Sequence, residues 1–196
     1  MTPDSSNIDK YTSAFAFVIL QDVTSIPFEF KNSPFKNVDI DKFFALIKEF
    51  LLYDLHVCDR CIFGFFGAEV RNELMQKIIT EIALRVEKAR EEMLDGLLDK
   101  LTIDNFANYL KTLQNTPDGE GLINDLNYVQ IEYSKYKFTK EFDKGFEGQL
   151  EWEFGKKIAS LVGHDNEASY VLYVTFRALG FFKLLMLTKK ILEKKL

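Results

Sequence analysis

Apolar residues recur at intervals of three and four through residues 41–66. This spacing places them on one face of an α-helix, and the segment is too long for a typical strand. Similar spacing recurs in residues 8–20, 68–101, 102–113 and 147–162, and in the segment that runs to the lysine-rich C-terminal end. Long helices of this kind have to bury their apolar faces against one another, which predicts a helix bundle.

Capping and terminating residues set the ends of these helices. Asp39 or Asp41 can accept hydrogen bonds from the first turn of the helix that follows, and we expect that helix to end near the glycines of 64–67. Gly163 is expected to end the helix over 147–162, because glycine readily adopts the left-handed conformation that closes a helix.

The fold class that follows is all-α, as a single domain over residues 1–196 with 1–7 flexible. We expect six to seven helices, two or three of them long and central; 196 residues with 47% hydrophobic content can form a sizeable core. Pro27 and Pro34 predict a connecting stretch after the first helix. Residues 126–142 suit a helix, which we favour, but they also alternate like a strand, so a minor strand pair stays open.

The charge and composition of the chain bear on its binding partners and on its location in the cell. The net charge of −5 provides no broad positive field, so we expect no nucleic-acid partner. The start of the sequence has no basic region of the kind that opens a signal peptide, and two cysteines make no secreted disulfide framework, which predicts a cytoplasmic protein. Arg177 and Lys183 interrupt the apolar C-terminal segment, so we expect a buried helix and no transmembrane segment.

The string HVCDRC at 56–61 holds both cysteines and one of the two histidines. On a helix, Cys58 and Cys61 fall on the apolar stripe, while His56 falls on the opposite, polar face with Asp59. One metal ion cannot collect ligands from both faces, and no second ligand pair exists, so we expect no metal and no cofactor. The cysteines are interpreted as core residues, and His56 with Asp59 as a surface pair.

Asp54 is a charged residue in the middle of the same apolar stripe. Arg177 falls on an apolar stripe of the last helix in the same way. A buried carboxylate is costly unless it is paired, so we expect Asp54 and Arg177 to meet as a polar centre in the core. Arg71, Arg85 and the tyrosine hydroxyls are the alternative partners of Asp54.

Small residues gather on one face of the helix predicted over 147–162. Gly148, Gly155 and Ala159 share this face with Trp152, the only tryptophan. Small residues permit another helix to approach closely, and an aromatic anchor beside them is typical of protein contacts. The face is therefore a candidate interface, either inside the monomer or with a partner subunit.

No nucleotide-binding or nucleophile-elbow motif is present, and whether the protein is an enzyme stays open. The leading hypothesis is a non-catalytic protein-interaction or self-associating module, including a homo-oligomer. The alternative is a binder of a small apolar ligand in a cavity lined by some of the 19 Phe, with Asp54 and Arg177 as its polar centre. A third hypothesis is an enzyme that uses His56 with Asp59.

Overall fold

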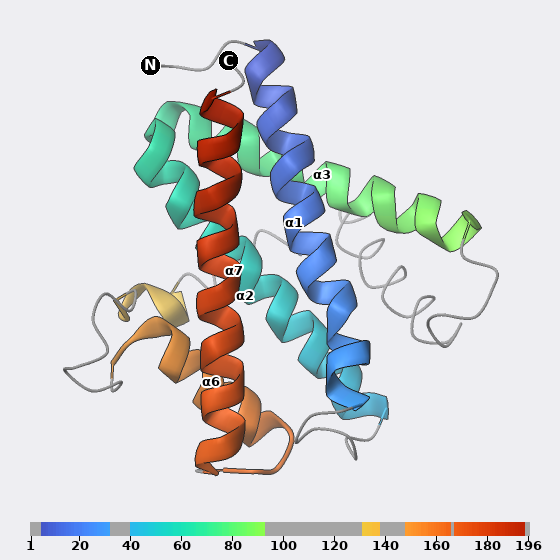
Figure 1. Cartoon of the computed structure of the whole chain (residues 1–196), viewed down its shortest axis with the longest axis vertical. Coiled ribbons are helices and arrows are strands. Elements are labelled where there is room, and N and C mark those ends of the chain that lie inside the picture. Colours follow the sequence, from blue (N-terminus) through green and yellow to red (C-terminus); the bar gives the residue numbers. More distant parts are fainter. Residues whose placement is uncertain (1–4, 32–39, 93–130, 138–147, 166, 195–196) are drawn as a thin grey trace.

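The computed structural model describes residues 5–31, 40–92, 131–137, 148–165 and 167–194 (Figure 1). Its five long helices are α1 (Ser5–Lys31), α2 (Ile40–Phe66), α3 (Ala68–Glu92), α6 (Leu150–Leu161) and α7 (Ala168–Lys194). The predicted all-α class is confirmed, since the described residues contain no strand. Helix 41–66 is also confirmed almost residue for residue by α2.

Helix α2 is the centre of the bundle, because it packs against each of α1, α3, α6 and α7. In Figure 1, α1 and α7 run antiparallel along the long axis, and α2 crosses behind α7. Every residue of α2 from 50 to 59 is buried. A helix enclosed on all sides in this way must bury its polar residues together with its apolar ones.

Two glycines with positive φ end helices where the sequence places them. Gly67, at φ +79°, follows α2, and its N–H donates to the Phe63 carbonyl at 2.9 Å. Gly163, at φ +87°, follows α6, and its N–H donates to the Ser160 carbonyl at 3.0 Å. The left-handed conformation lets these short connections reverse the chain, so α3 and α7 return against the core.

The expected break at Pro27 is wrong, because α1 continues through this residue to Lys31. Proline removes one helical N–H donor, but its fixed φ is compatible with a helix, so a long helix can tolerate it near its end. Helix α1 also begins at Ser5, inside the segment 1–7 that we expected to be flexible.

Only residues 131–137 of the ambiguous segment 126–142 are described. Residues 131–134 form a helical turn, and Lys137 makes an isolated parallel bridge with Gln149. Tyr133 fastens this turn to α2, because its hydroxyl donates to Glu49 Oε1 at 2.9 Å. Arg60 of α2 adds a bond to the Tyr136 carbonyl at 3.3 Å. The helix predicted over 102–113 lies outside the described residues.

Helices α6 and α7 approach closely at Gly155. A Cβ atom added there would lie 2.6 Å from the Val171 carbonyl oxygen and 2.8 Å from Thr175 Oγ1. Thr175 joins the two helices, because its hydroxyl contacts the carbonyls of Val171 at 2.7 Å and Glu151 at 3.3 Å. Glycine at 155 is therefore a packing requirement.

We predict that Gly155→Ala lowers the free energy of unfolding by about 1–3 kcal/mol, the usual cost of overpacking a core. Gly180→Ala in α7 is the matched control, since no neighbouring atom lies within 4 Å of its added Cβ. This variant should be more stable by about 0.5–1 kcal/mol, because alanine favours helix over glycine. Urea unfolding measures both, and equal effects of the two substitutions would contradict the close approach of α6 and α7.

Candidate functional site

A buried polar centre lies where α1, α2, α6 and α7 meet. Arg177 of α7, with its side chain 7% exposed, forms an ion pair with Asp22 Oδ2 of α1 at 3.0 Å. Its Nη2 also donates to the Asp22 backbone carbonyl at 2.5 Å and to Ser25 Oγ at 3.0 Å. The guanidinium lies 5.2 Å from the centroid of the Phe50 ring. These contacts attach α7 firmly to α1 and α2.

Asp54 of α2 belongs to the same centre and is 1% exposed. Burial raises the pKa of its carboxyl well above the ordinary value, and the charge of Asp22 raises it further. Arg177 lowers this pKa, and a hydrogen bond with the Asp22 carboxyl raises it. The protonated form of Asp54 is thus favoured, and Asp54 and Asp22 form a carboxyl pair beside one guanidinium.

The structure therefore brings Asp54 and Arg177 into one cluster, but the carboxylate that ion-pairs with Arg177 at 3.0 Å is that of Asp22. Sequence reasoning missed Asp22. Its signal was available, because Asp22 follows Phe15 and Ile19 at spacings of seven and three, on the buried face of α1. The two alternative arginine partners are engaged elsewhere, Arg71 with Asp59 at 2.5 Å and Arg85 with Glu81 at 2.8 Å.

Glu151 and Tyr53 complete the surroundings of this centre, and both are fully buried. The pKa of the Tyr53 hydroxyl is raised well above its ordinary value by burial first, then by the charges of Glu151 and Asp54. Asp22 and Asp54 share the one guanidinium of Arg177, so the raised pKa of Asp54 favours a proton on this pair in place of a second cation. In the described residues, no group of three or more His, Cys, Asp or Glu side chains is arranged to hold a metal ion.

The expected surface pair of His56 and Asp59 is wrong. His56 is 1% exposed and Asp59 is 6% exposed. Arg71 of α3 covers Asp59 with a two-pronged ion pair, at 2.5 Å and 2.7 Å. Tyr133 packs beside His56, with the ring centroids 5.7 Å apart. The polar face of α2 is thus covered by α3 and by residues 131–137, which the helical period of α2 alone cannot reveal.

Neither ring nitrogen of His56 has a hydrogen-bond partner in the described residues. Burial lowers the pKa of His56 to about 4, and the nearby charges of Arg60 and Arg71 lower it as well. His56 is therefore neutral at physiological pH, and the hydrogen bond to Asp59 that an enzyme would use to orient it is absent.

Cys58 and Cys61 are free thiols buried in the core, as the helical geometry predicts. Burial raises the pKa of Cys58 well above its ordinary value and that of Cys61 to about 12. Because the thiolate is the reactive form, both cysteines are poor nucleophiles.

The four residues of the candidate interface on α6 lie in different surroundings. Gly155 and Ala159 are buried inside the chain, and Gly155 faces α7, so the close helix approach is internal. A subunit interface through Gly155 and Ala159 is therefore wrong. Trp152 is partly buried against the core, while Gly148 lies before α6, is exposed and has φ +74°. The small-residue pattern indicates close helix packing without saying which helix approaches.

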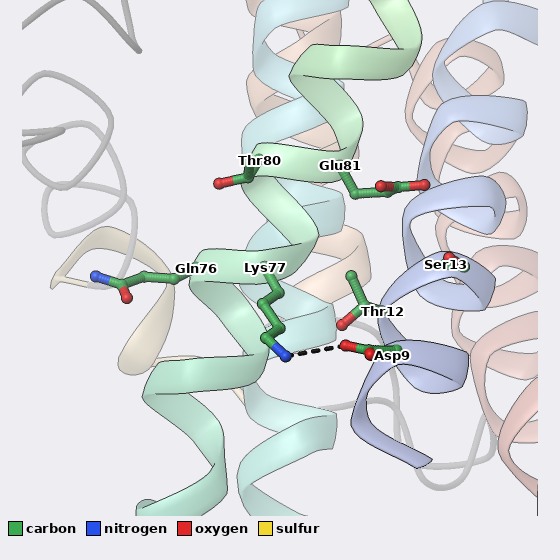
Figure 2. Close-up of a pocket in the computed structure, with 7 residues that line it drawn as sticks. All are labelled: Asp9, Thr12, Ser13, Gln76, Lys77, Thr80 and Glu81. Carbon is green, nitrogen blue, oxygen red and sulfur yellow. Dashed lines mark hydrogen bonds and ion pairs between the residues drawn. The ribbon is translucent and has the colours of Figure 1, made fainter. Parts of the chain in front are cut away.

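A cavity of about 470 Å³ lies between α1 and α3 and is lined by polar residues. Figure 2 shows Lys77 of α3 reaching toward Asp9 of α1, where they form an ion pair at 2.9 Å. Glu81 is held by Arg85 at 2.8 Å. The residues that line the cavity include no phenylalanine and neither Asp54 nor Arg177, so it does not match the predicted apolar ligand site.

The outer face of α7 carries large apolar side chains in contact with solvent. They are Phe176, Leu184, Leu187 and Ile191, which are 59%, 40%, 52% and 45% exposed. Their spacings of three, four and eight residues place them on one side of the helix. Gly180 lies on the same side and is also exposed. We name these five residues the outer face of α7.

Comparisons with known proteins find no relative: no family model matches, and no curated protein or solved structure is similar. Functional argument for this chain therefore rests on its own side chains.

We predict that Asp54→Asn stabilises the protein at pH 8 by on the order of 1–3 kcal/mol, since the neutral amide folds without the proton uptake that the Asp54 carboxylate requires at this pH. A carboxyl whose pKa is raised on folding contributes stability that is complete below its unfolded pKa, near 3.8, and is lost as pH rises toward the folded pKa. The advantage of Asp54→Asn over the wild type should therefore grow as pH rises from 4. Urea unfolding across pH 4–8 measures it. Exposed Asp165→Asn is the control, and an advantage no larger than that of this control would contradict the buried carboxyl pair.

His56→Leu should show the opposite pH dependence. The pKa of His56 falls from 6.5 to about 4 on folding, so its contribution is complete above pH 6.5 and is lost as pH falls through 4. The variant should gain on the order of 2–3 kcal/mol over the wild type between pH 6.5 and pH 4. The same unfolding series measures this, and parallel losses in the two proteins would show that His56 titrates normally.

Proposed function

We propose that this protein is a non-catalytic binding protein whose contact surface is the outer face of α7. The supporting observation is the exposure of four large apolar side chains along one side of a helix. Scattered exposed apolar residues are ordinary, but an aligned set is typical of interaction sites. In Figure 1, α7 extends along the front of the molecule, and no described helix crosses in front of it.

Helix α7 has two different sides. Its inner side carries buried residues such as Val174, Ala178 and Phe181. By length and composition alone α7 could span a membrane, yet only 39% of its most apolar 18-residue window is buried in the bundle. A helix that served the core alone would carry polar residues outside, so the apolar outer face supports a second contact.

Gly180 adds to this support. It lies mid-helix, and no neighbouring atom lies within 4 Å of the position that a Cβ would occupy. Glycine at such a position costs about 0.5–1 kcal/mol relative to alanine, and no contact among the described residues requires it. A flat surface beside Phe176 and Leu184 suits contact with a partner.

The alternatives have less support. An enzyme based on His56 and Asp59 lacks access, because both side chains are buried and Asp59 is held by Arg71. A ligand pocket at Asp54 and Arg177 has less support, because the guanidinium already contacts Asp22, Ser25 and Phe50 of the same chain. We retain the cytoplasm as the proposed location, which suits the two free cysteines.

Leu187→Cys tests whether the outer face is covered in living cells. Treatment of intact cells and of the dilute purified protein with N-ethylmaleimide, followed by peptide mass spectrometry, gives the labelling rate in each setting. We expect Cys at 187 to react at least severalfold more slowly in cells. Cys58 and Cys61 are buried with raised pKa values, so they contribute little background.

Ser160→Cys is the matched control, because Ser160 is exposed on α6 and lies outside the outer face of α7. Its labelling rate should be the same in cells and in purified protein. Equal rates in both settings for the variant at 187 would contradict a binding role of this face.

A further inference from the structure

We infer that the partner of the outer face of α7 is an anionic lipid surface, on which the helix lies parallel to the membrane plane. This inference rests on the proposed function, since it names what covers that face. It combines the apolar side chains with the charges beside them, with the area that they offer and with the way α7 is fixed to the bundle.

The apolar residues have the arrangement of an interfacial helix. Phe176, Leu184, Leu187 and Ile191 extend over residues 176–191 of the 27-residue helix α7. Large apolar side chains on one side of a helix bury themselves about 5–10 Å deep at the boundary of headgroups and acyl chains. The residues of the outer face can enter this layer together, because they point the same way.

Three lysines lie along the same side. Lys183, Lys190 and Lys194 are exposed, and their spacings of seven and four place them beside Leu187. None of the three forms an ion pair with another described residue. The only acidic residue of α7, Glu193, already pairs with Lys189 at 2.6 Å.

This local positive charge contrasts with the net charge of −5 of the whole chain. Lysines flanking an apolar helix face attract anionic headgroups, and each contributes about 1 kcal/mol near such a surface. The same lysines oppose contact with a second copy, because a symmetric contact of two α7 helices brings lysine rows together without acidic partners. The charges thus favour a lipid surface over a homodimer.

The exposed apolar area of the outer face of α7 also favours a lipid surface. The four large side chains expose roughly 350 Å² in total, at their observed exposures. A stable protein–protein interface buries about 800 Å² on each partner, so these four side chains supply less than half of the area that a homodimer needs. A lipid surface needs no complementary shape, and an apolar strip with cationic neighbours is sufficient for reversible attachment.

Helix α7 lies on the surface and does not cross it, because its inner side is held in the protein. Arg177 is 7% exposed and is bound to Asp22 of α1, at 3.0 Å. Insertion across a bilayer would break this buried ion pair and expose its charges to hydrocarbon. The bundle therefore docks as one folded body.

Vesicle co-sedimentation of the full chain tests the inference. The probes are phosphatidylcholine vesicles with and without about a third of phosphatidylglycerol, at low and high salt. We expect binding to the anionic vesicles that weakens at high salt, and much weaker binding to the neutral ones. Leu187→Glu should reduce binding at least tenfold. Lys190→Glu should reduce it at least fivefold, which corresponds to about 1 kcal/mol or more.

Lys156→Glu is the matched control, since it makes the same charge change at an exposed position of α6. It should leave binding unchanged, and circular dichroism melting checks that each variant is folded. Binding that Leu187→Glu and Lys190→Glu leave intact would overturn the inference, as would equal losses in Lys156→Glu. Size-exclusion chromatography with light scattering adds one more outcome: a dimer abolished by Leu187→Glu would assign the face to a second copy.

The labelling experiment at position 187 separates the two proposals. Absence of vesicle binding with protection of Cys at 187 in cells would overturn the lipid partner and leave the binding role standing. Absence of both would overturn both.

Discussion

Enclosure of α2 is the constraint on which the rest of the structure depends. Four helices pack around it, and residues 50–59 are all buried. Asp54, His56 and Asp59 therefore lie in the interior and have to be accommodated there. Each is accommodated differently: Asp59 by an ion pair with Arg71, Asp54 by a proton and the Asp22–Arg177 pair, and His56 by remaining neutral. These solutions determine which helices contact α2 and in which register.

Helix positions and ends are predictable from the sequence, because they depend on local signals. The 3.6-residue period gives α2, and positive-φ glycines give the ends of α2 and α6. The complete burial of α2, in contrast, depends on contacts with segments that are distant in the sequence. The side chain that covers His56 is Tyr133, fastened to Glu49 from 84 positions away in the sequence. A helical period shows a polar face and cannot show that another segment will cover it, so the sequence alone predicts His56 at the surface.

The polar centre was predictable only in part for the same reason. Asp54 and Arg177 each stand out within an apolar stripe of their own helix, which is enough to predict that both enter the core. Their surroundings depend on how α1 packs, and α1 brings Asp22 to the guanidinium over 155 positions of sequence. Likewise Gly155 indicates a close helix approach, but only the packing shows that the approaching helix is α7 of the same chain.

The same centre explains how α7 can be apolar on both sides and still belong to a folded bundle. Its inner side is fixed by the Arg177–Asp22 ion pair and by the contact of Thr175 with α6. These bonds are directional, so they fix the rotation of α7 about its own axis as well as its position. Fixed rotation keeps Phe176, Leu184, Leu187 and Ile191 pointing outward together. A helix held by apolar packing alone could turn to bury some of these residues. The buried charges thus maintain the exposed apolar face on which the proposed binding depends.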